Sequence, residues 1–373
     1  VSLPMPTPLP RGPAWNSFFI GRYLGMDRFV YEFDLRKATG PLLTEPIRDM
    51  SSILHNQDEV NQISLRHFHH KATKRKGGKG SGQKKRANQN QNQNQTKLYM
   101  ATCDDAGTIR VMDAASTRSD VLHHDANAVV VIPTCAFRRG PQKSLELASG
   151  GTDCNIRLWD ATKPKKPIST FLVKQAVDAE QDGSSTVTRP QVANPPFVYS
   201  LDWSESGKLL AAGYGNGDAG VFCVESGSLV QVGLLEGGHA SSVASVMFPR
   251  FARGNERVVV TAGTDSTILI WDVGMGVVGV ESNYNNPRNL FSQSFLSNQG
   301  MAMQTGSAIS TPAAATDEIT RDLQSMMSDK PQVLFGINHT AKVNWVCSTR
   351  HPAALFVADT SNDITCYDIP SAQ

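Results

Sequence analysis

Long apolar runs, closely paired cysteines and a signal peptide are all missing from this chain of 373 residues. No apolar stretch approaches the roughly 18 residues that a membrane-spanning helix requires, so the sequence contains no transmembrane candidate. The six cysteines are scattered, without the spacing typical of zinc ligands or of a disulfide framework. We therefore expect reduced, packed thiols in a protein of the nucleus, the cytoplasm or both.

Catalytic signatures are missing as well. The chain has no Gly-x-Ser-x-Gly turn, no phosphate-binding loop that ends in Lys-Ser/Thr, and no clustered metal ligands. His67, His69 and His70 lie among lysines that would repel a cation, and no carboxylate or thiolate accompanies them. We therefore predict no metal site and no cofactor, and the sequence does not indicate an enzyme.

Two similar segments, 147–160 and 260–272, organise the sequence that is present. Each has an apolar run, a hydroxyl residue, Thr-Asp and a terminal Trp-Asp. The hydroxyl residue lies four positions before an aspartate that itself lies six positions before the tryptophan: Ser149, Asp153 and Trp159 in the first segment, and Thr261, Asp265 and Trp271 in the second. Such self-similarity is typical of a repeated structural unit.

A histidine precedes each segment, His124 in the first case and His239 in the second. His239 lies four residues before Val243, where an alternating strand is predicted to begin. Histidine, hydroxyl, aspartate and tryptophan can form one hydrogen-bonded chain that fixes a turn between two strands, so we predict a structural tetrad in each segment. A catalytic triad uses similar residue types, but this hydroxyl would be buried against tryptophan, without oxyanion donors.

This pattern resembles the WD-repeat family, whose repeats form the four-stranded blades of a β-propeller. The resemblance implies an all-β propeller of WD40 repeats, in which about six blades can be counted. The relatives that it resembles have seven, so we expect an initial blade upstream of Val1. A first residue other than Met fits a processed or truncated N-terminus.

We expect one large propeller domain, because a ring of six or seven blades uses a chain of this length. Its blades are predicted over residues 1–273, interrupted by a disordered insert at 66–96 and a loop at 174–194. A disordered segment at 274–331 and a final blade at 332–373 are predicted to follow.

The insert at 66–96 is strongly basic. It contains nine of the 36 lysines and arginines, whereas the rest of the chain has 27 basic and 34 acidic residues. Its basic residues include two clusters: Lys74, Arg75 and Lys76, and Lys84, Lys85 and Arg86. With almost no apolar side chain, the insert cannot offset its ordering entropy. It is either a nuclear-localisation signal or an arm that contacts RNA or DNA, or else a solvated expansion without a partner.

The final blade and the order of regular and degenerate blades resemble a group of WD-repeat proteins implicated as substrate receptors of cullin-4 ubiquitin ligases. That resemblance implies docking on the damaged-DNA-binding adaptor of these ligases through a Trp-Asp-x-Arg element after a third strand. Both Trp-Asp signatures lack the arginine, because Thr162 and Gly274 occupy its position. Phe33, Asp34 and Arg36 retain the element, with phenylalanine replacing tryptophan.

An exposed arginine after a strand can form a charge-assisted pair with a carboxylate of a partner. The alternative is that Arg36 only solvates the start of a loop. We therefore predict a non-enzymatic protein-interaction scaffold that serves as a substrate receptor on the cullin-4 adaptor. The competing hypothesis is a nuclear propeller, associated with RNA or chromatin, that binds phosphates through its basic insert.

Overall fold

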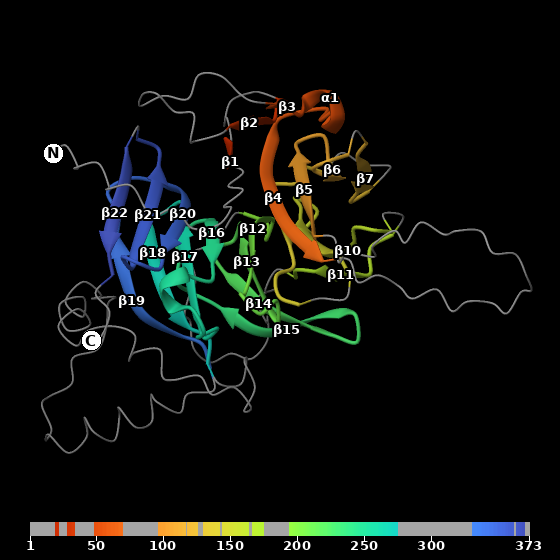
Figure 1. Ribbon diagram of the computed structural model, residues 1–373. Helices are drawn as coiled ribbons and strands as arrows, with labels where there is room; N and C mark the ends of the chain where they lie inside the picture. The colour runs from red at the N-terminus through yellow and green to blue at the C-terminus, as the bar shows by residue number, and fades with distance from the viewer. Residues whose placement is uncertain are drawn as a thin grey trace, which may run out of the picture.

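The computed structural model describes residues 19–21, 28–33, 48–69, 96–116, 118–125, 130–141, 144–163, 166–174, 194–274, 330–361 and 363–369. These residues form six antiparallel sheets, in each of which the strands pair in the order of the chain. Figure 1 shows the sheets following one another from the sheet that contains β4 (orange) to the sheet that ends at β22 (blue). Within the described part of the chain, no helix is long and apolar enough to cross a membrane.

The N-terminal sheet is small and comprises β1 (Phe19–Gly21), β2 (Tyr31–Phe33) and β3 (Arg48–Asp49). The short helix α1 (Ser51–Leu54) follows it. The next sheet comprises β4 (Val60–His69), β5 (Thr96–Asp104), β6 (Thr108–Asp113) and β7 (Asp120–His123). The third comprises β8 (Thr134–Phe137), β9 (Glu146–Gly150), β10 (Asn155–Asp160) and β11 (Ser169–Leu172).

Three further sheets complete the described ring. One comprises β12 (Val198–Trp203), β13 (Leu209–Tyr214), β14 (Ala219–Glu225) and β15 (Ser228–Leu235). The next comprises β16 (Val243–Met247), β17 (Val258–Gly263), β18 (Thr267–Asp272) and β19 (Gln332–Asn338). The last comprises β20 (Val343–Thr349), β21 (Ala354–Asp359) and β22 (Ile364–Asp368). The chain therefore returns from residue 330 to complete the β16–β18 blade with β19 before it enters the final blade.

The second strand of a blade is the most apolar. β13 reads Leu-Leu-Ala-Ala-Gly-Tyr and β17 reads Val-Val-Val-Thr-Ala-Gly, and every residue of both strands is buried. Each of these strands pairs on both edges within its own sheet and packs against neighbouring sheets, so neither face meets water. A short continuous apolar run is the sequence pattern of such a strand.

Apolar side chains join each sheet to the next. Trp203 of β12 packs in one cluster with Leu158 of β10, and Trp271 of β18 packs in another with Leu209 of β13. The N-terminal sheet joins the ring in the same way, because Val30 packs with Met100 of β5. Each such contact removes apolar surface from water, and this burial stabilises the folded state by roughly 25 cal/mol per Å². Burial between the blades therefore holds the propeller together.

The first strands of successive blades are also joined by hydrogen bonds. The Ser64 hydroxyl of β4 accepts the N–H of Phe137 in β8 at 3.0 Å, and Thr134 of β8 accepts the N–H of Leu201 in β12 at 3.0 Å. Ser200 of β12 accepts the N–H of Val246 in β16, also at 3.0 Å. These first strands surround a central channel of about 750 Å³. The first strand of a blade has no paired strand on its channel side. In these three cases a hydroxyl of the preceding first strand satisfies one of its backbone N–H groups.

The two faces of the ring carry different connections, because paired strands alternate in direction. Connections from first to second strands, and from third to fourth strands, emerge on one face. We call this the insert face, since the connection between β4 and β5 contains the basic insert. Connections from second to third strands, and from one blade to the next, lie on the opposite face.

The predicted start of the insert at residue 66 was wrong. β4 continues to His69 and β5 begins at Thr96, so the strands extend into both ends of the expected segment. Phe68 explains the difference, because its side chain is only 8% exposed and contacts Tyr99 edge to face. This aromatic contact between the two strands helps to stabilise the longer hairpin.

Candidate functional site

The residues predicted as the first tetrad lie together at one edge of their blade. Ser149 Oγ accepts the indole N–H of Trp159 at 2.8 Å and lies 2.6 Å from Nε2 of His124. The other ring nitrogen, Nδ1, lies 3.3 Å from the carboxylate of Asp153. Arg157 adds a partner that the pattern did not indicate, since Nη1 lies 2.5 Å from the Asp153 carboxylate.

The second tetrad has nearly the same geometry. Thr261 Oγ1 accepts the Trp271 indole N–H at 2.8 Å and lies 2.7 Å from Nε2 of His239. Nδ1 of His239 lies 3.2 Å from Asp265 Oδ1, and that carboxylate also accepts the hydroxyl of Thr267 at 2.7 Å. Burial alone would raise the pKa of Asp265, but the hydrogen bonds from His239 and Thr267 outweigh it and lower the pKa to about 2.

The tetrads can hold strands together but offer no reacting centre. The hydroxyl residues Ser149 and Thr261 are both 0% exposed. Each hydroxyl oxygen already accepts an indole proton and contacts an imidazole, so a substrate carbonyl would have no approach to it. The tetrads therefore tie the third strand of a blade to the histidine that precedes the blade.

The final blade contains a related chain of hydrogen bonds that the sequence analysis missed. Nε2 of His339 lies 2.7 Å from Asp359 Oδ2, and Nδ1 lies 2.7 Å from the hydroxyl of Tyr367. Tyr367 replaces the tryptophan, and the aspartate has moved to the end of β21. One signal was available, because His339 lies four residues before Val343 just as His239 lies four before Val243.

The β4–β7 blade uses a further variant without histidine. Asn56 lies four residues before Val60, and its side-chain oxygen accepts the Thr102 hydroxyl at 3.0 Å. Asp104 accepts both the backbone N–H and the hydroxyl of Thr108, at 2.8 and 2.5 Å. The same position in the blade therefore holds a polar bridge even where the residue types differ.

The residues predicted to dock on an adaptor are only partly described. Phe33 ends β2, where its backbone pairs with Phe19 of β1. Asp34 and Arg36 lie outside the described residues. So do both basic clusters of the insert and nearly all of the segments at 174–194 and 274–331.

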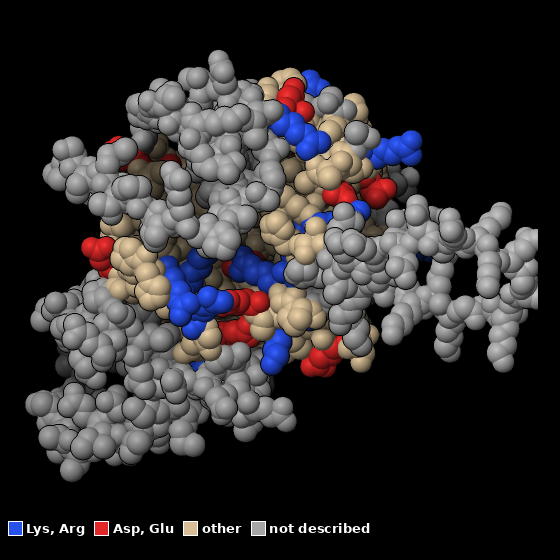
Figure 2. All heavy atoms as spheres, viewed as in Figure 1, with Lys and Arg blue, Asp and Glu red and all other residues tan. Residues whose placement is uncertain are grey.

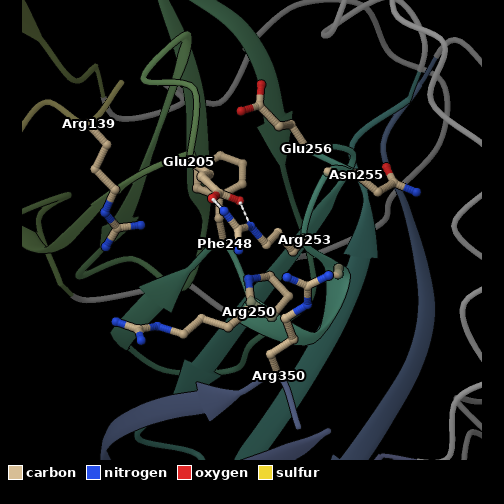
Figure 3. Close-up of a pocket in the computed structure, with 11 residues that line it drawn as sticks. Arg139, Glu205, Phe248, Arg250, Arg253, Asn255, Glu256 and Arg350 are labelled. Carbon is tan, nitrogen blue, oxygen red and sulfur yellow. Dashed lines mark hydrogen bonds and ion pairs between the residues drawn. The ribbon is translucent and has the colours of Figure 1, made fainter. Parts of the chain in front are cut away.

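The insert face carries a second feature, which we call the arginine cavity. It has a volume of about 350 Å³, and its lining includes Arg139, Arg250, Arg253 and Arg350, with Glu205 and Glu256. Figure 3 shows these side chains around the hollow. Arg139, Phe248 and Arg250 also line the central channel, so the cavity adjoins the end of the channel.

These arginines come from three separate connections. Arg139 follows β8, Arg250 and Arg253 lie between β16 and β17, and Arg350 follows β20. Glu205, which follows β12, pairs with Arg253. Figure 2 shows blue and red side chains gathered near the middle of the described surface. Sequence reasoning could not find this site, because no local motif links residues about a hundred positions apart.

Comparison with known proteins agrees with the geometry. The family model described as "WD domain, G-beta repeat" matches residues 120–160 and 230–272, which contain the two tetrad tryptophans. Together with the blades and the tetrads, this match shows WD40 repeats in a β-propeller arrangement of the described residues. WD40 propellers are typical protein-interaction scaffolds, and their homologues are generally non-enzymatic. The predicted family and fold class are therefore confirmed.

The chain is also similar to individual members. It is 26% identical over 278 residues to the WD repeat-containing protein 53 homolog of Dictyostelium discoideum, over 73% of this chain and 64% of that protein. The group of WD-repeat proteins that the final blade resembles is represented by WD repeat-containing protein 53, so this similarity agrees with that resemblance. The chain is 30% identical over 165 residues to human F-box-like/WD repeat-containing protein TBL1X, over 44% of this chain and 25% of that protein. The chain thus spans less than two thirds of each of these relatives.

Proposed function

We propose that this propeller is a scaffold that brings a protein substrate to a cullin-4 ubiquitin ligase and docks on the damaged-DNA-binding adaptor through Phe33, Asp34 and Arg36. The observation that supports this proposal is the position of β2. It is the middle strand of the N-terminal sheet and ends at Phe33. The Asp-x-Arg residues therefore follow directly after a strand that pairs on both edges, as the third strand of a blade does.

The similarity to the WD repeat-containing protein 53 homolog gives the proposal a second support, because it extends over most of this chain. An arginine that projects from such a connection offers two parallel N–H donors to a carboxylate, a geometry that lysine does not reproduce.

Calorimetry with the purified adaptor tests this function. Arg36→Ala should weaken binding by about 2 kcal/mol or more, mainly through faster dissociation, because it removes one partner of a charged pair. The matched control is Arg28→Ala, which removes an exposed arginine eight positions earlier. Equal affinity of the wild type and Arg36→Ala would exclude 33–36 as the docking element.

A nuclear propeller that binds RNA or chromatin is the second candidate. The observation that favours it is the position of the basic insert, which leaves β4 and returns to β5 on the same face as the arginine cavity. A polyanion could then contact both the insert and the rim of the cavity.

Gel-shift titration with RNA and with duplex DNA separates the two candidates. The affinity for nucleic acid should fall steeply between low and physiological salt, and deletion of residues 70–95 should abolish it. The same deletion should reduce nuclear accumulation of a fluorescent fusion. Salt-independent binding, or a deletion variant that binds as the wild type does, would rule out the phosphate-binding role.

A further inference from the structure

The arginine cavity contains both satisfied and unsatisfied cations. Arg253 makes a two-point contact with Glu205, with nitrogen–oxygen distances of 2.6 and 2.9 Å. Arg139 pairs with Asp202 at 2.7 Å and also donates to the carbonyl of Trp203 at 2.6 Å. These two guanidinium groups therefore already have oxygen partners.

Arg250 and Arg350 differ from them. Both are exposed at the cavity, and within the described residues neither guanidinium group makes a hydrogen bond or an ion pair. Figure 3 shows dashed lines only between Arg253 and Glu205. The Arg250 backbone is nonetheless fixed, because its N–H donates to the Ser348 hydroxyl at 2.8 Å. The backbone of Arg250 is thus anchored to β20, the strand that directly precedes Arg350.

The nearby carboxylates are already engaged. Glu205 holds Arg253, Asp202 holds Arg139 and accepts the N–H of Phe248 at 3.0 Å, and Glu256 accepts the N–H of Ser206 at 2.9 Å. The lining of the two cavities contains five arginines against these three carboxylates. A concave site with an excess of one charge concentrates the field and favours an oppositely charged ligand.

A like-charge contact lies at the same end of the channel. The Arg66 guanidinium donates to the carbonyl of Gly140, next to Arg139. Burial and the charge of Arg139 both lower the pKa of Arg66. The protein therefore holds cations together at this position although they repel each other, and an anion would relieve that repulsion.

The walls of the cavity favour a peptide over a nucleic-acid backbone. Phe248, Pro249 and Ala252 supply apolar surface beside the arginines, and Glu205 places a carboxylate at the rim, where it would repel a run of phosphates. A volume of about 350 Å³ lies at the lower end of ligand-site volumes and fits a few side chains.

We propose that the arginine cavity binds an acidic segment of a partner protein, whose carboxylates pair with Arg250 and Arg350 while an apolar side chain lies against Phe248. This inference rests on the proposed scaffold function, because it gives the chemistry of one partner. It does not depend on the adaptor element, since that element follows β2, whereas the cavity arginines follow β8, β16 and β20.

Fluorescence anisotropy with the full chain tests the proposal. The probes are a labelled acidic peptide, GSDELFEDSG, its amide counterpart GSNQLFQNSG, and a short oligouridylate. The acidic peptide should bind at least about tenfold more tightly than the amide peptide. Arg250→Glu/Arg350→Glu should remove that preference, and Arg250→Lys/Arg350→Lys should retain only part of it, because lysine lacks the two-point geometry.

The matched control is Lys174→Glu/Lys342→Glu. It makes the same change in net charge at two exposed lysines that follow outer strands, on the opposite face. This control should bind the acidic peptide as the wild type does, and both variants should melt at the wild-type temperature.

Three results would overturn the inference. They are equal binding of the acidic and amide peptides, an Arg250→Glu/Arg350→Glu variant that retains the preference, and an equal loss in the lysine control. An oligouridylate that binds more tightly than the acidic peptide, and displaces it, would assign the cavity to nucleic acid instead. The adaptor titration with Arg36→Ala reads out independently, so failure of one proposal can be told from failure of the other.

Discussion

The most direct perturbation of the second tetrad is Thr261→Val, which replaces a hydroxyl by a methyl group of similar size. Thr261 is fully buried, and its oxygen is shared between the indole of Trp271 at 2.8 Å and Nε2 of His239 at 2.7 Å. The substitution leaves no cavity. It removes a hydrogen-bond acceptor from one buried group and a donor from the other.

The loss of stability follows from the two buried groups that lose a partner, the indole N–H of Trp271 and Nε2 of His239. Each buried donor or acceptor left without a partner costs about 1–3 kcal/mol, so loss of both partners should lower the free energy of unfolding by about 2–6 kcal/mol. Water cannot replace the lost partner easily, because Trp271 is 4% and His239 8% exposed. Thr261→Ser keeps the hydroxyl, as Ser149 does in the other tetrad, and should lose only about 1 kcal/mol for the missing methyl group.

Thermal melting and urea denaturation at neutral pH measure this difference. The matched control is Thr264→Val, three residues further on, where the hydroxyl donates to Ser241 at 2.8 Å in a half-buried turn. Water can replace that bond, so the control should change stability by less than about 1 kcal/mol. If Thr261→Val melts no lower than Thr264→Val, the tetrad does not stabilise the blade.

Three other outcomes are expected. Tyr214→Phe should leave the melting temperature unchanged or raise it, because the Tyr214 hydroxyl is buried without a partner. Tyr367→Phe should lower the melting temperature, because it removes the 2.7 Å contact to His339. A fall in both variants would contradict this reasoning. The folded-state pKa of Asp265, about 2, lies below its ordinary value, so the stability that it contributes is present above about pH 4. That contribution should be lost as the pH falls to about 2, and Asp265→Asn should show a shallower loss in acid melts. Deletion of 70–95 should leave the melting temperature within about 2 °C of the wild type, since β4 and β5 are complete without it; an unfolded product would show that the insert is structural.

The sequence was sufficient for the two complete motifs, because each motif is local. Ser149, Asp153 and Trp159 lie within eleven positions of one another, and the alternation of apolar residues sets which of them share a face. The prediction that placed 332–338 in the final blade was wrong, because β19 pairs with β18 across a long connection. The sequence was less informative where a blade uses other residue types. The polar bridges of Asn56 and His339 keep only the four-residue spacing to the following strand, which is a weaker signal than a complete motif.

Phe68 shows where local reasoning failed. In the sequence it is one aromatic residue among basic and polar neighbours, and composition predicts disorder there. In the fold it faces Tyr99 across the hairpin and packs in the cluster that joins two blades. Burial between sheets is a property of the assembled ring, so composition over a short window could not register it.

By itself, the sequence determined the fold class, the repeat and the residues able to form the tetrads, because all of these depend on spacings shorter than one blade. Only the tertiary structure decided that Arg139, Arg250 and Arg350 line one cavity. They come from three blades, and their proximity depends on how the blades pack around the channel. No periodicity in the chain encodes that distance, since it is set by the apolar clusters between sheets.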